Sequence, residues 1–577
     1  MKIIKLSVQN FRGILHLDWW TDQQPICCLI GPGDSLKSTI LDAVEAALSS
    51  RWFSFGEADF TQCDTTKDLK IEVTVGELSK QLLSDEKFGL YIRGLSPEGK
   101  LRDEPEDGDE AVLTIRLSVD ATMEPQWEAI NDRAQYPRTM SNRDRALFRV
   151  VRLTGDDARH LTWGQGSILA KLTESGDEAA QQLAEAYRAA KASAQLDKIK
   201  SLVEVATEAQ KRAVEVGAQI SDRYTPGLEL GRGGFSAGSI ALHDGKVPLR
   251  LAGTGTRRLA TLAIQRAAID EGAIVLVDEI EQGLEPHRIL GAISHLKRSQ
   301  SEAVGTGRPT GQILMTTHSD IALSEVDPKA LFVCRRAAAG HLNVLHPSDQ
   351  VALKRVLKHS PRALFARRIL VCEGDTELGL ALGLRDLYPA RRDDTSIEQR
   401  GVAIIDGGGS AAPHVAAALG GLGFAVALYR DSDVRLPAAQ QKELDALLVT
   451  TITYMSNIAV DQAIFMAISD DALIDILLIV AEEFKGSAAV VDQINKAFPE
   501  VGSDGVSDVT FADWEFDPPL TRAEVIGRLG LLAKKNGWFK NRYISRGLAP
   551  TVDKAVQQDP KTEMAAALRT IEAWLYA

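Results

Sequence analysis

The sequence predicts an α/β protein in which two sets of βα units follow one another. Short apolar runs typical of strands alternate with helical stretches between residues 225 and 318, and again from residue 363 onward. This alternation is typical of parallel sheets covered by helices. A chain of 577 residues has room for about four domain-sized units.

Composition excludes several classes of protein. Apolar residues make up 45% and charged residues 25%, which is ordinary globular usage and excludes a disordered or fibrous chain. A net charge of −13 excludes a uniformly basic nucleic-acid coat, so any DNA contact must come from local basic patches. No apolar run is long enough to cross a bilayer, and no membrane partner is expected. The five cysteines lack C-x-x-C spacing and the N-terminus lacks an apolar signal core, so we expect a reducing, cytoplasmic location.

The N-terminal part is expected to be rich in strands. Strands are predicted at 69–75 and 111–120, with an exposed polar loop at 95–110. Residues 177–216 contain neither Gly nor Pro and predict one or two long helices. Such helices could form a solvated hairpin or an oligomerisation arm, and composition alone leaves both open.

The stretch from Gly31 to Thr39 is typical of a phosphate-binding loop. It follows the apolar run ICCLI and opens a predicted helix, so backbone N–H groups could surround phosphates. Lys37 would reach the β- and γ-phosphates, and the Ser38 hydroxyl would hold Mg²⁺. Leu36 stands where the pattern has glycine, which puts nucleotide affinity and turnover in question; an ordinary loop-to-helix junction is the alternative. The candidate nucleotide-binding residues here are Gly31, Gly33, Asp34, Ser35, Leu36, Lys37, Ser38 and Thr39.

Three later segments favour an ATPase over an ordinary junction. An apolar strand at 273–279 ends in Asp278, expected in the Mg²⁺ shell, and Glu279, expected to polarise the attacking water. A glycine-rich turn containing Gly253 and Gly255 leads into a helix. His318 follows the strand at 312–318, where it could touch a γ-phosphate, although a single histidine at a strand end is more often structural.

A second candidate site consists of acids after two strands. Glu373 and Glu377 follow the predicted strand at 369–372, and Asp431 and Asp433 follow the strand at 425–429. The ends of parallel strands meet at one sheet edge, and four carboxylates there require cations such as Mg²⁺ or Mn²⁺. Two such ions can activate water and stabilise the leaving oxygen in phosphodiester cleavage. Asp406 is a further ligand or, as we favour, the acid of a glycine-rich turn.

Basic and aromatic residues gather near the end of the chain. They could form a solvated helix surface or contact phosphate, and one lysine would stabilise the transition state, with Lys540 and Lys535 as candidates. The cluster consists of Lys534, Lys535, Lys540, Arg542 and Arg546, interleaved with Trp538, Phe539 and Tyr543.

The order of the first set of motifs resembles the ABC-type ATPase heads of recombination-repair and chromosome-maintenance ATPases. Asn10-Phe11-Arg12-Gly13 is similar to the start of those heads and adds Arg12 to the nucleotide site. The resemblance implies that the turn at Gly253–Arg257 closes over ATP bound to a second subunit, hence a homodimer through the heads. The loop Glu281–Glu285 would cross that interface, and Gln62 is a candidate glutamine switch.

E-G-x-x-E at Glu373–Glu377 and D-x-D at Asp431–Asp433 resemble a Toprim domain, and a head followed by Toprim resembles the OLD (overcoming lysogenization defect) nucleases. The nuclease subunit of the Gabija anti-phage system is of similar build. The resemblance implies an ATP-binding, Mg²⁺- or Mn²⁺-dependent DNA endonuclease in phage defence, with the helices at 177–216 as a dimerisation arm and a UvrD-like helicase as a candidate partner. The alternative is a non-nucleolytic ATPase of DNA repair or chromosome maintenance with a Toprim-like binding module.

The corresponding domain boundaries are an ATPase head at 1–160 and 223–360, interrupted by a helical insert at 161–222. A Toprim domain with a helical insertion is expected at 361–577.

Overall fold

The computed structural model describes residues 1–51, 53–153, 198–215, 246–270, 272–305, 311–337, 340–501 and 505–577, with isolated residues and short stretches between 160 and 244. The chain divides into two compact units, residues 1–27 with 38–316, and residues 28–37 with 317–577. Strands and helices alternate in both units, which confirms the predicted α/β class.

A large antiparallel sheet occupies the first unit. Its strands are β1 (Lys2–Phe11), β2 (Ile14–Trp20), β4 (Leu69–Gly76), β5 (Ile92–Leu95), β6 (Leu101–Arg102), β7 (Glu110–Val119), β8 (Pro125–Ile130) and β9 (Arg138–Thr139). The order is β2-β1-β4-β7-β5-β6, and β8 pairs with β7 and β9. The two strands predicted at 69–75 and 111–120 are confirmed as β4 and β7. The predicted exposed loop at 95–110 is confirmed in part, because Leu95 ends β5, β6 lies within the loop, Glu110 begins β7, and Leu95 and Ser96 are buried.

Three buried parallel strands form the second layer of the first unit. They are β10 (Val151–Leu153), β13 (Ile274–Val277) and β14 (Gln312–Thr316), paired in that order. The flanking helices are α1 (Lys37–Leu48), α7 (Thr254–Asp270) and α8 (Pro286–Gly305). Every side chain of β13 and β14 is buried, as expected for strands covered on both faces.

The remaining elements of the first unit are short, apart from α6 (Lys200–Glu215). They are α2 (Asp85–Phe88), α3 (Asn142–Ala146), β11 (His243–Asp244) and β12 (Val247–Pro248). The helix predicted within 177–216 is confirmed over α6, and most of the segment before residue 198 lies outside the described residues.

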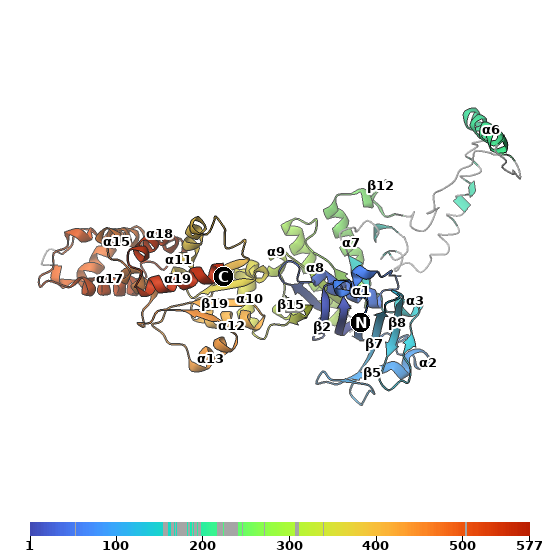
Figure 1. The fold of residues 1–577 in the computed structure, drawn as a ribbon, viewed down its shortest axis with the longest axis horizontal. Coiled ribbons are helices and arrows are strands. Elements are labelled where there is room, and N and C mark those ends of the chain that lie inside the picture. The colour runs from blue at the N-terminus through green and yellow to red at the C-terminus, as the bar shows by residue number, and fades with distance from the viewer. Residues whose placement is uncertain are drawn as a thin grey trace. The chain divides into compact units, whose positions relative to one another are not determined.

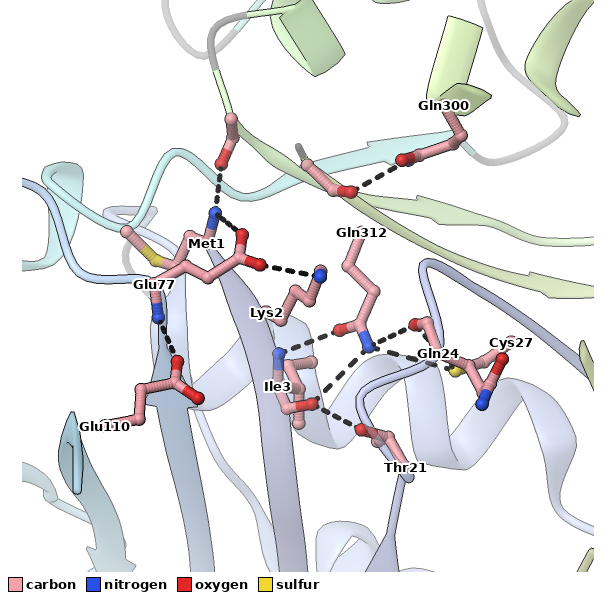
Figure 2. A network of polar contacts seen from close by, with 12 residues as sticks. Met1, Lys2, Ile3, Thr21, Gln24, Cys27, Glu77, Glu110, Gln300 and Gln312 are labelled. Carbon is pink, nitrogen blue, oxygen red and sulfur yellow. Dashed lines mark hydrogen bonds and ion pairs between the residues drawn. The ribbon is translucent and has the colours of Figure 1, made fainter. Parts of the chain in front are cut away.

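A buried glutamine joins the two layers of the first unit (Figure 2). Gln312, at the start of β14, accepts a hydrogen bond from Ile3 N at 2.8 Å and donates one to Gln24 O at 2.9 Å. Because its side chain is fully buried, its bond to Ile3 N satisfies a buried backbone group that has no water available, and its other bond reaches the half-buried Gln24. The regular pairing of β1 with β4 is interrupted between Ile3 and Lys5, and the glutamine amide bonds at this irregularity.

The second unit contains part of β3 (Ile26–Ile30), with β15 (Leu331–Arg336) parallel to it and β16 (Leu342–Leu345) antiparallel to β15. Two helices follow, α9 (Asp320–Ser324) and α10 (Gln350–His359), and then the 3₁₀ turn η10 (Pro361–Phe365). A separate parallel sheet then has the order β18-β17-β19-β20. Its strands are β17 (Arg368–Cys372), β18 (Val402–Asp406), β19 (Ala425–Tyr429) and β20 (Thr450–Ile452).

Helices make up most of the rest of the second unit (Figure 1). They are α11 (Asp375–Leu387), α12 (Ala412–Gly421), α13 (Ala438–Ala446), α14 (Val460–Met466), α15 (Asp471–Lys485), α16 (Ser487–Ala497), α17 (Arg522–Asn536), α18 (Arg542–Gln558) and α19 (Glu563–Tyr576). A continuous apolar core joins β17 and β19 to α11 and to α14–α19.

Two glycines allow α18 to pack closely on α11. A Cβ atom at Gly379 would lie 2.5 Å from Arg542 O, and one at Gly383 would lie 2.4 Å from Ala549 Cβ. Residues 379 and 383 are one helical turn apart and share one face of α11. Any larger side chain at either position would push α18 away from the helix that begins beside the acidic residues.

We predict that Gln312→Leu destabilises the first unit by about 2–4 kcal/mol, because the buried Ile3 N–H and the half-buried Gln24 carbonyl lose their partner. Urea unfolding followed by circular dichroism measures the change. Gln126→Leu, at an exposed position of β8, is the matched control and should change stability by less than about 0.5 kcal/mol. Equal effects of the two substitutions would contradict the role assigned to Gln312.

Candidate functional site

The acidic residues of the second unit meet at one edge of its parallel sheet. Cys372 at the end of β17 lies opposite Asp406 of β18 and Tyr429 of β19, so the residues after these strands emerge together. Asp431 N donates a hydrogen bond to Glu373 Oε2 at 3.2 Å. The sheet therefore brings the E-G-x-x-E and D-x-D segments side by side, as parallel strand ends predict.

Glu377 is buried at the centre of this cluster, beside the half-buried Asp431. Glu377 is 3% exposed, and its Oε2 accepts a hydrogen bond from Gly374 N at 3.1 Å at the start of α11. Asp431 Oδ1 accepts one from Val460 N at 2.6 Å at the start of α14. Burial, with the negative charge of Asp431, raises the pKa of Glu377 well above its ordinary value. Burial also raises the pKa of Asp431, and the Val460 N–H opposes that rise.

Two side-chain cations pair with the outer acids. Arg430 Nε lies 3.2 Å from Glu373 Oε2, and its Nη2 donates to Val434 O at 2.9 Å. Lys534 Nζ of α17 lies 2.6 Å from Asp433 Oδ2. Burial raises the pKa of Glu373, although Arg430 acts in the opposite direction. Sequence reasoning singled out neither cation as a partner of these acids.

Asp461 is a fifth acid that sequence reasoning missed. It lies in the first turn of α14 and is 2% exposed, and its Oδ1 has no hydrogen-bond partner among the described residues. Burial first, and then the charge of Asp431, raises the pKa of Asp461 to about 6, while Lys540 and Lys534 oppose the rise. The only hint in the sequence is an acid soon after a short loop, which carries little information by itself.

The C-terminal basic cluster is divided by the structure. Lys534 and Lys540 act on the acids, whereas Lys535 is exposed and makes no ion pair within the described chain. The aromatic residues that accompany the cluster are also divided. Trp538 and Phe539 are fully buried in the core, so they do not face a nucleic acid, while Tyr543 is 84% exposed.

Asp406 belongs to a turn. Its Oδ1 accepts a hydrogen bond from Gly408 N at 2.8 Å, and its Oδ2 lies 2.7 Å from Arg355 Nη2. Gly408 has a φ of 84°, where a glycine is favoured. These contacts support the turn interpretation that the sequence favoured.

In the predicted phosphate-binding loop, the side chain of Lys37 folds back onto the loop. Lys37 Nζ is 3.2 Å from Gly31 O, 3.1 Å from Pro32 O and 3.1 Å from Ser35 Oγ. Leu36 has a φ of 64°, in the left-handed region where glycine is ordinarily found. The leucine therefore adopts the backbone conformation of the glycine it replaces. Of the other candidates, Gly33 and Asp34 are exposed, and Thr39 is half-buried in the first turn of α1.

Asp278 is the centre of a polar cluster in the first unit. Its Oδ1 accepts hydrogen bonds from Ser38 Oγ at 3.0 Å and from Thr316 Oγ1 at 2.7 Å. Its Oδ2 lies 2.9 Å from Nη2 of the buried Arg152. The pairing of Ser38 with Asp278 is the one expected of two groups that share a Mg²⁺ ion. Glu279, the expected water-polarising acid, is exposed beside it.

Two buried arginines support this cluster; no sequence motif indicated Arg152, and Arg258 follows the glycine-rich turn without a predicted role of its own. Arg152 also pairs with Asp42 Oδ1 at 2.9 Å, and Asp42 is hydrogen-bonded to Arg12 of the N-F-R segment. Arg258 donates to the backbone oxygens of Asp278 and Glu279 at 2.9 and 3.1 Å. Arg12 is therefore linked to Asp278 through Asp42 and Arg152, and its contact with the nucleotide stays a prediction.

The glycine-rich turn and the loop after the acid pair lie together. A Cβ atom at Gly255 would be 2.9 Å from Gly283 O, so the loop 281–285 packs on the first turn of α7. Gly253 begins this turn, and Arg257 N donates to its carbonyl at 3.0 Å. In the second unit, His318 is exposed and its ring stacks on Phe365 of η10, with centroids 6.0 Å apart. Gln62 is exposed, and its role as a glutamine switch stays a prediction.

Two protein-family models match the chain. Residues 170–324 match an AAA domain family whose description names the AbiEii toxin of a type IV TA system. Residues 364–433 match the Toprim domain of proteins like the overcoming lysogenization defect protein. The chain therefore combines a match to an ATPase domain with a match to an OLD-like Toprim domain, and we refer to this arrangement as an ATPase–Toprim fusion. The second match ends at Asp433 and so contains the four predicted acids of the Toprim site.

Solved structures with a similar fold match part of this chain. The SMC head bound to the C-terminal winged-helix domain of ScpA is 17% identical, with 61% of this chain and 100% of that chain covered and a TM-score of 0.32. RecF with ATP is 11% identical, with 59% and 99% covered and a TM-score of 0.31. No curated protein matches the chain.

The donor chemistry of the fusion fits nucleotide and divalent-metal binding. All five Toprim acids offer hard oxygen donors, and Asp461 supplies a buried oxygen without a partner. Across the described ranges, no three His, Cys, Asp or Glu side chains are already arranged to hold an ion. Two of the acids point to cations instead, since Glu373 pairs with Arg430 and Asp433 pairs with Lys534. Within the same ranges, no helix has the length and apolar character needed to span a bilayer.

We predict that Leu36→Val lowers the affinity for ATP about tenfold, because a β-branched residue tolerates a left-handed φ poorly, at about 1–2 kcal/mol. Leu36→Gly should bind ATP at least as well as the wild type. Isothermal titration with a slowly hydrolysed ATP analogue compares the two variants. Equal affinities of the valine and glycine variants would show that the backbone at position 36 does not limit binding.

The raised pKa of Asp461 predicts a stability change with pH in metal-free protein. A group whose pKa rises from 3.8 to about 6 on folding stabilises the fold at low pH, and this stability is lost as pH rises toward 6 and above. Asp461→Asn should therefore be more stable than the wild type at pH 8 by up to about 3 kcal/mol, and equally stable below about pH 4. Urea unfolding in EDTA at both pH values measures this, with the exposed Asp445→Asn as control. A loss of stability at pH 8 would contradict the prediction.

Proposed function

We propose that this ATPase–Toprim fusion is a divalent-metal-dependent DNA endonuclease whose cutting is regulated by ATP. The observation that carries the proposal is the group of five carboxylates at the ends of β17 and β19 and at the starts of α11 and α14. Two of these acids, Glu377 and Asp461, are buried and Asp431 is half-buried, in a position where unpaired charges are unstable. A function that requires bound cations explains why they are retained there.

Each group in the site has a role in phosphodiester hydrolysis. A divalent ion bound by the acids supplies an activated water and stabilises negative charge at phosphorus. Glu377, Asp431 and Asp461 would be ligands of the ion, and hydrogen bonds to the starts of α11 and α14 fix the positions of Glu377 and Asp431. Lys540, exposed at the start of the last helical pair, contacts the phosphate and stabilises charge in the transition state.

The rest of the basic cluster supports DNA as the substrate. Arg542 lies 3.9 Å from Asp375 at the start of α11, and Tyr543 is exposed beside it. A phosphate backbone can pair with such cations, and an exposed aromatic ring can stack on a base. An overall charge of −13 restricts this contact to the local cluster.

ATP regulation is supported by contacts within the second unit. His318, the candidate γ-phosphate contact, stacks on Phe365, and Asp320 pairs with Arg362 at 2.5 Å. Phe365 and Arg362 belong to η10, which leads directly into β17 and hence to Glu373. A nucleotide that favours one conformation of residues 318–320 would therefore bias the position of β17.

We also propose a homodimer formed by the ATPase part and α6. Apolar side chains on and beside α6 are 36–69% exposed, namely Ile199, Leu202, Val203 and Val205. A second copy of the helix would cover them. We also propose a role in anti-phage defence and a UvrD-like helicase partner, and the resemblance to OLD and Gabija nucleases is the sole support for both.

Plasmid nicking tests the proposed activity. Wild-type protein with Mg²⁺ or Mn²⁺ should convert supercoiled DNA to the nicked form, and Glu377→Gln should lower the rate about 100-fold or more, since several kcal/mol of transition-state stabilisation is lost. Glu398→Gln, at an exposed position of the same unit, is the control. Addition of ATP gives the sign of regulation. ATP turnover without any cleavage by the wild type would instead favour a non-nucleolytic ATPase.

A further inference from the structure

The hairpin of β15 and β16 contacts the start of the phosphate-binding loop within the second unit. Residues 28–30 of β3 pair in parallel with residues 331–333 of β15. The chain passes from β3 directly into the loop at Gly31, where a Cβ atom would lie 2.6 Å from Cys334 O. The first residue of the loop therefore rests on the backbone of β15.

Arg335, the next residue of β15, joins the hairpin to the turn that precedes β19. Its guanidinium carbon lies 3.7 Å from the centre of the Phe424 ring, and its Nε donates to Leu422 O at 3.4 Å. Phe424 is buried, so the cation and the ring meet away from water, where this kind of contact is strongest. Burial lowers the pKa of Arg335 to about 10, which leaves its guanidinium charged at neutral pH.

The turn before β19 fits closely against the same hairpin. Gly423 has a φ of 73°, and a Cβ atom there would lie 3.2 Å from Leu345 Cδ1 of β16 and 3.4 Å from Arg335 Cγ. β19 begins two residues later, is paired with β17 and β20, and ends two residues before Asp431. A strand paired on both sides moves as a unit, so a shift of the turn would reach the D-x-D segment.

A nucleotide would act on this series of contacts at its first member. Lys37 Nζ donates to Gly31 O at 3.2 Å, and a triphosphate would compete for the same ammonium group. Loss of that hydrogen bond changes the restraints on Gly31, the residue that rests on Cys334 of β15.

We propose that β15 transmits the nucleotide state of the loop at 31–37 to the D-x-D acids through the contact between Arg335 and Phe424. Arg335 is a positioning residue, since it acts on the acids through β19. This contact is separate from that of His318 with Phe365, which acts on β17. The inference rests on the proposed regulation of the nuclease by ATP and names the contact that carries it.

Hydrogen exchange measured by mass spectrometry tests the proposal without relying on cleavage. In full-length wild-type protein, saturation with Mg²⁺ and the ATP analogue AMP-PNP should change the exchange of the amides at 422–430 by about threefold or more. Arg335→Met should abolish this change and still bind AMP-PNP in an isothermal titration. The matched control, Arg336→Met, removes the neighbouring exposed cation and should keep the change. Equal responses of the two variants, or no response of the saturated wild type, would overturn the proposal.

Phe424→Leu is a second variant, which keeps an apolar side chain and removes the ring beneath the guanidinium. It should lose the response of residues 422–430 to AMP-PNP, and this test remains available if Arg335→Met does not fold. A folded Phe424→Leu protein with the full wild-type response would contradict the role of the contact.

Plasmid nicking distinguishes this inference from the proposed function. ATP should change the wild-type nicking rate by about fivefold or more, and Arg335→Met should nick DNA at a rate that ATP no longer changes. A variant that responds to ATP as the wild type does would overturn the inference and leave the nuclease in place. Failure of the wild type to nick DNA would count against the nuclease function alone, because the exchange measurement does not depend on cleavage.

Discussion

Repulsion among like charges at one sheet edge is the constraint on which the second unit depends. β17 and β19 bring their following acids into contact, and the fold compensates in three ways. Arg430 and Lys534 neutralise Glu373 and Asp433. The starts of α11 and α14 donate backbone N–H groups to Glu377 and Asp431, where the helix dipole also favours negative charge. The negative charge that these partners do not compensate could be neutralised by a metal ion.

The first unit solves a similar problem with buried arginines. Asp278 would be an isolated acid at the end of β13 without Arg152, which also pairs with Asp42, and Arg258, which binds the backbone oxygens of Asp278 and Glu279. Ser38 and Thr316 complete the hydrogen bonds of the carboxylate.

Local patterns predicted the parts of both sites that lie within one βα unit. Glu373 and Asp431 could be recognised because each follows an apolar run, and parallel strand ends converge. Asp461, Lys534 and Arg152 could not, because their roles depend on helices and strands that meet only in the folded chain. Trp538 and Phe539 looked like a nucleic-acid surface but are core residues, since composition does not show which side of a helix end faces inward. The left-handed backbone conformation of Leu36 could likewise not be predicted, because leucine rarely adopts a positive φ.

The close packing at Gly379 and Gly383 has a consequence for how this module can be exchanged between proteins. The matched Toprim segment stops at Asp433, yet Asp461 and both site lysines come later in the chain. α18 rests on α11 without space for even a methyl group, so the strand core and the C-terminal helices must change together. Recombination that joins a Toprim core to foreign helices would keep the motifs and lose the ion site. The unit of inheritance is therefore the whole segment from β17 to α19.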